Sequence, residues 1–183
     1  MGGITIEHRR FEARVRWALR FRHLDLARCS ERARHRAWAA LVAWQTGRPA
    51  PGTRPTADGV PETQQALREC VEALAQRLPD MVWMPETGWA IFPSRRPGEP
   101  ITRVQGDRGG ERLTPAAVVF QLVDDLNAIG AHRLRSCPLE TNGQPCGVIF
   151  LATRRQRFCS RRHAVADAQK RYEPKRKARR RDY

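Results

Sequence analysis

Three cysteines and one histidine near the end of the chain constrain its fold more than any other feature. Their spacing is C-x8-C-x12-C-x3-H, formed by Cys137, Cys146, Cys159 and His163. Prolines and a glycine between the first two cysteines favour a turn that brings both sulfurs to one point. The last two residues, four apart, share one face of an expected helix. Four such ligands suit tetrahedral zinc and leave no place for a catalytic water, so the pattern predicts a closed structural site.

The other cysteines and histidines offer few competing ligands. Four of the ten Cys and His residues fall within 27 positions. His132 is the one residue that we consider as a substitute for His163. Cys70 lies on the apolar stripe of an expected helix and is interpreted as a small buried hydrophobe. The chain has five cysteines and no recognisable export signal, so reduced thiols or a metal site are favoured over disulfide bonds.

Charge is concentrated at both ends of the chain. The 183 residues include 34 basic and 19 acidic residues, a formal charge of +15. Residues 1–48 contribute +7, residues 49–153 contribute −2 and residues 154–183 contribute +10. This asymmetry predicts a polyanionic partner. A solvated arginine-rich surface is the alternative for the first cluster, because arginines outnumber lysines throughout the chain.

The basic residues around and after the metal pattern are the candidate nucleic-acid contacts. Arginine and lysine side chains there would neutralise phosphates and release condensed counterions. The alternative for the final cluster is a tail that only aids solubility. The candidates are Arg154, Arg155, Arg161, Arg162, Lys170, Arg171, Lys175, Arg176, Lys177, Arg179, Arg180 and Arg181.

Periodicity and turn residues predict an α+β protein: a mainly helical N-terminal domain with a small antiparallel β element, followed by a small C-terminal zinc finger. Ser30 and Thr114-Pro115 mark helix starts, while Gly47 and Gly130 mark helix ends. We expect a basic helical segment at residues 1–48 and a Pro/Gly-rich linker at 49–61. An α+β core follows at 62–130, then the finger at 131–173 and a basic tail at 174–183.

Within the finger, we expect residues 148–152 to form a strand that returns at Phe158. A helix should then run from about Cys159 to Glu173, where Pro174 ends or kinks it. Apolar residues along this helix are expected to face the small core of the finger: Ala164, Val165, Ala168 and Tyr172.

Several short segments of the finger resemble the CGNR-type zinc finger. These are Arg133-Leu134-Arg135-Ser136-Cys137, Cys146-Gly147-Val148-Ile149-Phe150, Arg157-Phe158-Cys159-Ser160 and Gln169-Lys170-Arg171-Tyr172. That treble-clef-like module ends bacterial proteins regarded as transcription regulators. The resemblance implies that the three cysteines are ligands, with His163 as a replacement. His163-Ala164-Val165-Ala166 stands where the family has Cys-Gly-Asn-Arg, so this chain resembles a divergent member.

These features favour a zinc-dependent nucleic-acid-binding protein, in particular a bacterial DNA-binding transcription regulator located with the nucleoid in the cytoplasm. Association with RNA or the ribosome is the main alternative. A treble-clef nuclease would need a second metal site that the sequence does not offer, and we expect no enzymatic activity. A membrane-surface role for the first helix ranks lower, since the zinc site has no part in it. The sequence allows a homodimer and leaves the effector ligand, target sequence and direction of regulation open.

Overall fold

The fold was examined in a computed structural model, which describes residues 6–47, 59–76, 82–84, 89–92, 102–104, 115–141, 143–153 and 155–181. For residues 82–84, 89–92, 102–104, 141 and 173–181 the description covers the backbone alone. Most of the expected linker and Arg154 lie outside these ranges. The chain forms two compact units, Met1–His132 and Arg133–Tyr183, called here the N-terminal and C-terminal units. Among the described helices, none has the length and hydropathy needed to cross a membrane.

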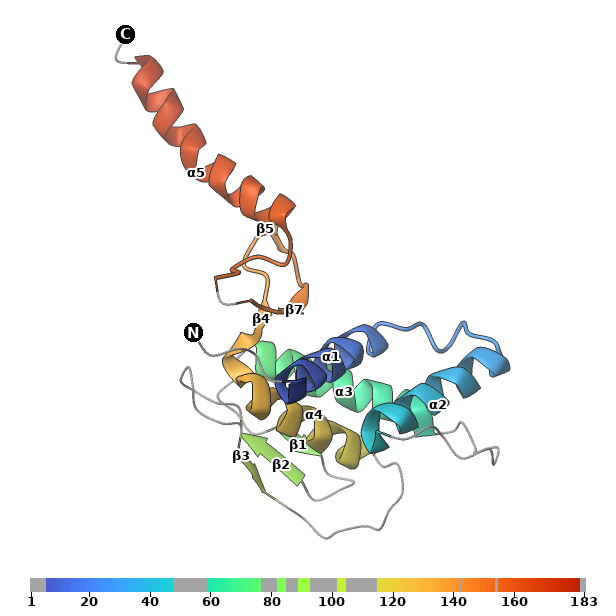
Figure 1. The fold of residues 1–183 in the computed structure, drawn as a ribbon. Coiled ribbons are helices and arrows are strands. Elements are labelled where there is room, and N and C mark those ends of the chain that lie inside the picture. Colours follow the sequence, from blue (N-terminus) through green and yellow to red (C-terminus); the bar gives the residue numbers. More distant parts are fainter. Residues whose placement is uncertain are drawn as a thin grey trace. The chain divides into compact units, whose positions relative to one another are not determined.

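Two helices open the N-terminal unit, α1 (Ile6–Phe21) and α2 (Glu31–Thr46) (Figure 1). Ser30 caps α2, because its side chain accepts a hydrogen bond from the backbone N–H of Ala33 at 3.3 Å. Gly47 ends α2 in the left-handed region, with φ of 69°. Both boundaries follow the sequence signals for helix capping.

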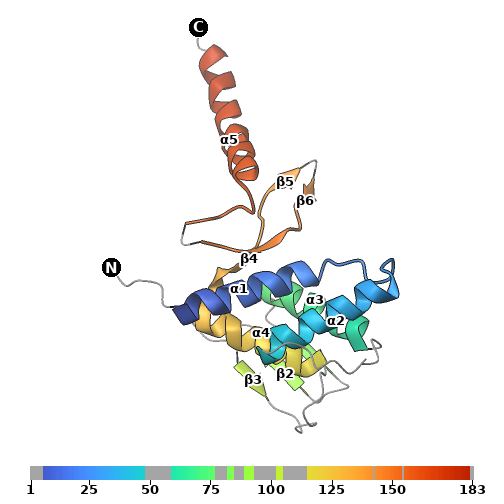
Figure 2. The ribbon, with the colours of Figure 1, turned by 45° about the vertical axis from the view of Figure 1, so that its right-hand side comes forward.

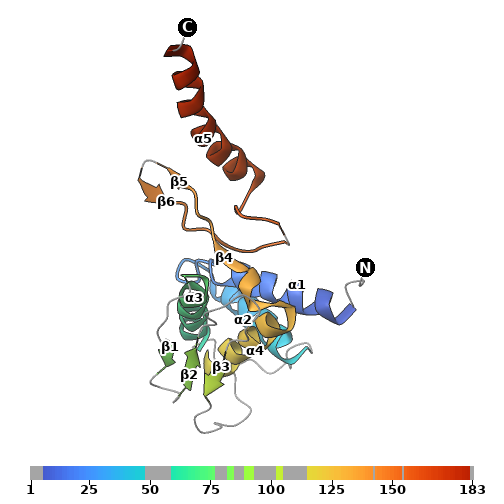
Figure 3. The ribbon, with the colours of Figure 1, turned by 90° about the vertical axis from the view of Figure 1, so that its left-hand side faces the viewer.

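Helices α3 (Val60–Gln76) and α4 (Pro115–Ile129) complete the helical layer (Figures 1 and 3). Helix α4 is apolar on nearly all sides and packs against both α1 and α3, as a helix at the centre of a core should. Cys70 is completely buried on α3, in agreement with its interpretation as a small hydrophobe.

One ion pair lies within this helical core. Arg14 on α1 donates from Nε to the Asp125 carboxylate on α4 at 2.8 Å, and the Asp125 side chain is fully buried. Burial raises the pKa of Asp125, while the charge of Arg14 and a hydrogen bond from Gln121 oppose the rise. Trp44 on α2 donates to the backbone carbonyl of Arg14 at 2.8 Å, which joins a third helix to the pair.

Side chains of α3 satisfy the carbonyl groups at the end of α1. Gln64 donates to the carbonyls of Phe21 and Leu24 at 2.7 and 2.8 Å, and Arg68 donates to that of Arg22 at 3.1 Å. The Phe21 and Leu24 carbonyls also accept from the backbone N–H groups of Leu24 and Leu26, at 3.1 and 3.0 Å. The arrangement buries Arg22 as well, leaving its side chain 2% exposed.

A small antiparallel sheet belongs to the same unit, as the sequence predicted. Its strands are β1 (Val82–Met84), β2 (Trp89–Phe92) and β3 (Thr102–Val104), paired in the order β1-β2-β3 (Figure 3). Trp83 lies opposite Ala90, which in turn lies opposite Val104. The mainly helical α+β class is therefore confirmed.

The C-terminal unit is built from short strands and one long helix (Figure 2). Strands β4 (Leu134–Ser136) and β7 (Ile149–Leu151) pair antiparallel, and β5 (Glu140–Thr141) pairs with β6 (Gln144–Pro145) in a hairpin closed by Gly143 at φ of 76°. The expected return strand at Phe158 was wrong. Strand β7 instead satisfies its backbone groups against β4, and the ladder extends through a bond from Cys137 N–H to the Val148 carbonyl.

Helix α5 (Arg161–Arg181) is longer than predicted. It begins two residues later than Cys159 and continues past Pro174, so the expectation that it ends at Glu173 was wrong. Proline removes one backbone hydrogen bond from a helix. The residues that follow are arginine, lysine and alanine, which are strong helix formers, and positive charge is favourable near a helix C-terminus.

Candidate metal centre

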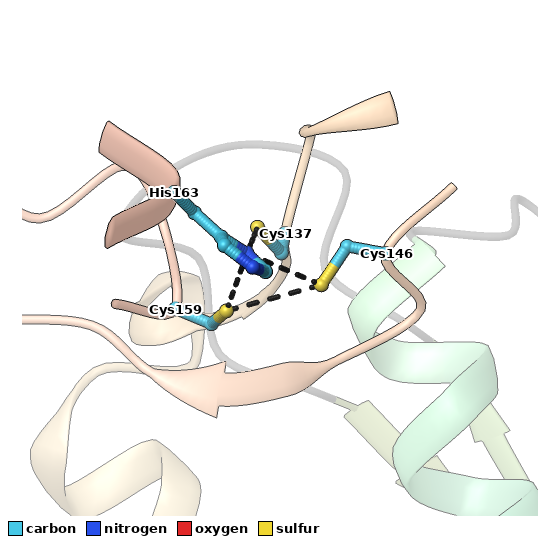
Figure 4. Close-up of side chains that lie close together, drawn as sticks. All are labelled: Cys137, Cys146, Cys159 and His163. Carbon is cyan, nitrogen blue, oxygen red and sulfur yellow. Dashed lines mark hydrogen bonds between the residues drawn. The ribbon is translucent and has the colours of Figure 1, made fainter. Parts of the chain in front are cut away.

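Each of the four predicted ligands is positioned by the end of a short element. Cys137 follows β4, and Cys146 follows β6, where its N–H donates to the Leu139 carbonyl at 2.8 Å. Cys159 precedes α5, and His163 lies in its first turn. Figure 4 shows the four side chains converging on one point from these separate segments.

The ligand atoms lie close enough to share one ion. All four are within 4.8 Å of one another. The Nδ1 atom of His163 is 3.6, 3.5 and 3.2 Å from the sulfurs of Cys137, Cys146 and Cys159 respectively, and the last two sulfurs are 3.9 Å apart.

These separations fit the edges of a tetrahedron. Zinc bonds of about 2.3 Å to sulfur and about 2.0 Å to nitrogen place two sulfurs about 3.8 Å apart, and a sulfur and a nitrogen about 3.5 Å apart. The four distances given above lie within a few tenths of an ångström of these values, and the two remaining sulfur–sulfur distances, both from Cys137, are at most 4.8 Å. The donor set also suits a borderline-soft ion, because three of its atoms are sulfur.

A small apolar core lies beside the cluster. Leu139 and Phe158 are buried together with Cys137, and Phe150 and Ala166 pack against them. Such a core shields the ligands on one side, while Cys146, Cys159 and His163 remain half-buried. The arrangement provides four protein ligands around a partly shielded point, which is typical of a structural metal site.

The thiols influence each other's ionisation. Burial raises the pKa of Cys137, but backbone N–H groups of Cys159 and Leu139 and the side chains of His163 and Cys159 outweigh it and lower the pKa to about 7. Burial, followed by hydrogen bonds with Cys137 and Cys146, raises the pKa of Cys159 to about 12. Ionisation of one thiol therefore makes ionisation of a neighbouring thiol less favourable. A bound cation would supply the positive charge that allows all three thiols to ionise.

Ser160 fixes the start of α5 and with it the position of His163. Its side-chain oxygen accepts from the His163 N–H at 3.2 Å, and its carbonyl accepts from the Ala164 N–H at 3.1 Å. This is the geometry of a helix N-cap. The sequence interpretation did not single out Ser160, although a serine just before a helical run is a recognised signal.

The structure brings together Cys137, Cys146, Cys159 and His163, and His132 is not part of this group. Cys29 and Cys70 belong to the N-terminal unit and are free thiols. Of the two histidines considered, the structure therefore selects His163.

The predicted phosphate contacts differ in how they are engaged. Lys170 donates to the Glu140 carbonyl, which holds α5 against the β5–β6 hairpin, and Arg171 pairs with Asp167. Exposed guanidinium groups are found at Arg155, Arg161 and Arg162. Arg154, and the side chains of Lys175, Arg176, Lys177, Arg179, Arg180 and Arg181, lie outside the described parts.

The prediction that the apolar residues of α5 face the small core of the finger was wrong for the four residues named. Val165 is 48% exposed and Tyr172 is 70% exposed, and Ala164 and Ala168 are exposed as well. Ala166 packs on the core instead. The physical reason is the rotation of the helix: His163 must face the cysteines, so residues about 180° away must face outward.

No protein-family model, curated protein or solved structure matches this chain.

Proposed function

We propose that the chain is a zinc-dependent DNA-binding protein, a divergent relative of the CGNR-type fingers, acting as a bacterial transcription regulator. The observation that carries the proposal is the Cys3His cluster at the start of a long basic helix. Zinc holds the C-terminal unit together, and α5 presents cations to the phosphate backbone.

Zinc is favoured over other ions by the donor set. Thiolates and an imidazole in tetrahedral spacing suit zinc, whereas calcium and magnesium take oxygen ligands. Because all four positions are filled by protein, the ion supplies folding energy and orients α5. This is why we assign the site a structural role and the protein no enzymatic one.

DNA is favoured by the distribution of charge. Residues 154–183 hold 13 basic and 3 acidic residues, and one of the acidic residues, Asp167, is paired with Arg171. A helix with this charge fits the major groove in width and attracts phosphates electrostatically. The resemblance of residues 133–172 to a finger of transcription regulators supports the same partner.

The first test is the zinc content of purified full-length protein. We expect one equivalent per chain in the natural protein and in Cys29→Ser, whose thiol lies outside the cluster. Cys159→Ser removes a ligand and should retain little or no zinc. Equal zinc in all three proteins, or none in any, contradicts the assignment of the metal site.

The second test is binding of the zinc-loaded protein to duplex DNA and to structured RNA over a range of salt concentrations. We expect tighter binding to duplex DNA, with an affinity that falls steeply as salt increases. Preference for structured RNA would contradict the transcription-regulator proposal and favour an RNA-associated function. Absence of binding to both would refute the nucleic-acid function.

A further inference from the structure

Helix α5 has two faces of different character. One face carries His163, Ala166 and Lys170. His163 belongs to the Cys/His cluster, Ala166 packs on the small core, and Lys170 contacts the β5–β6 hairpin. We call the opposite side the outer face; it consists of Arg161, Val165, Ala168 and Tyr172, which lie about 140–200° around the axis from His163.

The outer face is apolar in its middle and exposed. Val165 and Tyr172 are 48% and 70% exposed, and they are two of the five large hydrophobic residues that are exposed in the described part of the chain. Exposed apolar residues grouped on one helix face indicate a contact surface. Their spacing, with Ala168 between them, aligns them along about two turns.

The positive charge around the outer face indicates which kind of partner this face can bind. Arg161 lies on the face itself, and Arg162 flanks it; both are exposed. The acidic residue of this stretch, Asp167, lies about 160° from Val165 and pairs with Arg171. A second copy of the same helix would bring two positive surfaces together, whereas a polyanion complements them.

We propose that the outer face of α5 is the sequence-reading surface of the protein, placed in the major groove with Val165, Ala168 and Tyr172 against base edges. This inference rests on the proposed DNA-binding function and deepens it. Arg161 and Arg162 contact the flanking phosphates.

The chemistry of the major groove supports this assignment. Thymine presents a methyl group there, and small or aliphatic side chains recognise it by apolar contact. The Val165 and Ala168 side chains are of that kind. The Tyr172 ring adds a large rigid surface with a hydroxyl that accepts or donates a hydrogen bond. Phosphate contacts alone would give affinity without sequence preference.

The test is selection of preferred sites from a random duplex library by the full-length, zinc-loaded protein. The natural protein should enrich a motif and bind it at least about 10-fold tighter than a scrambled duplex, as base contacts of this size allow. The double variant Val165→Ala/Tyr172→Ala should lose most of that preference. Both positions are exposed and alanine favours helix, so we expect zinc content to be unchanged.

A matched variant, Arg161→Ala/Arg162→Ala, separates the two kinds of contact. It should weaken binding to motif and scrambled DNA alike and make the salt dependence shallower by about one unit per lost contact. The apolar variant should leave binding to scrambled DNA and its salt dependence unchanged.

Three results would overturn the inference. The first is that the natural protein binds all duplexes equally, and the second is that the apolar variant keeps the full sequence preference. The third is that the apolar variant loses self-association in sedimentation and keeps its sequence preference. In each case general DNA binding survives. If the natural protein binds no duplex at all, the proposed function itself fails.

Discussion

Arg22 is a permanent charge in a nearly fully buried position. Its Nε atom has no hydrogen-bond partner among the described residues, and burial lowers its pKa, although the nearby charge of Glu72 opposes this. Removing a guanidinium from water costs several kcal/mol unless it is well paired. Burial of Arg22 therefore lowers the free energy of unfolding of the N-terminal unit.

We expect Arg22→Met to stabilise the N-terminal unit by about 1–2 kcal/mol, because an apolar side chain of similar length avoids the desolvation cost. Urea unfolding followed by tryptophan fluorescence measures the change. Arg28→Met is the control: the Arg28 side chain is 89% exposed, and its exposed ion pair should contribute little. A clear loss of stability in Arg22→Met would mean that the charge has a partner that stabilises the fold.

The Arg14–Asp125 pair should show the opposite behaviour when only one partner is removed. Asp125→Leu leaves the Arg14 guanidinium unpaired in the core, and we expect a loss of about 3 kcal/mol. The double variant Arg14→Met/Asp125→Leu should recover most of that loss. A double-mutant cycle of unfolding free energies tests both statements, and additive effects would argue against coupling across the 2.8 Å contact.

At the scale of elements, we expect the N-cap of α5 to link helix stability to the proposed metal binding. Ser160→Ala removes the hydrogen bond that the Ser160 side chain accepts from His163 N–H, at a cost of about 1 kcal/mol. The proposed zinc site couples metal binding to folding of the C-terminal unit, so we expect zinc affinity to fall about fivefold. Competition with a chromophoric chelator measures it. Ser160→Asp preserves the cap and should bind zinc as the natural protein does.

The end of α5 should contribute to DNA affinity without contributing to specificity. We expect Lys175→Ala/Arg179→Ala/Arg180→Ala to weaken binding equally for all sequences. Alanine keeps the helical backbone favourable, so the change acts on charge. The slope of log K against log salt should become shallower by nearly one unit per lost contact. An unchanged slope would exclude these residues as phosphate contacts.

The boundaries of the helices were predictable because local residues determine them. Ser30, Gly47, Pro115 and Gly130 mark ends that the structure places within a residue of the prediction. The clustering of Cys137, Cys146, Cys159 and His163 was predictable for a similar reason: their residue types and spacing are visible without the fold.

The rotation of α5 was not predictable in the same way. Apolar periodicity normally identifies the buried face of a helix, but here contacts of His163 with the cysteines accompany a rotation that leaves Val165 and Tyr172 exposed. The pairing of β7 with β4 is likewise set by contacts between segments more than ten residues apart. Local sequence carries little information about either.

At the scale of the whole molecule, the two units should respond differently to loss of metal. A strong chelator should abolish the protection from hydrogen exchange in residues 133–181 and leave the N-terminal unit folded. All five tryptophans lie before residue 133, so tryptophan fluorescence reports the N-terminal unit alone and should not change. Simultaneous loss of both signals would show that the units unfold together.

The small core beside the ligands has a consequence for how the C-terminal unit behaves in a cell. A core centred on Cys137, Leu139 and Phe158 buries little apolar surface, so under the proposed zinc-binding role we expect the ion to supply most of the folding free energy. Each tenfold change in free ion concentration above the dissociation constant then alters stability by about 1.4 kcal/mol. Under the same proposal, the fraction of molecules with an ordered α5 would vary with the concentration of free zinc.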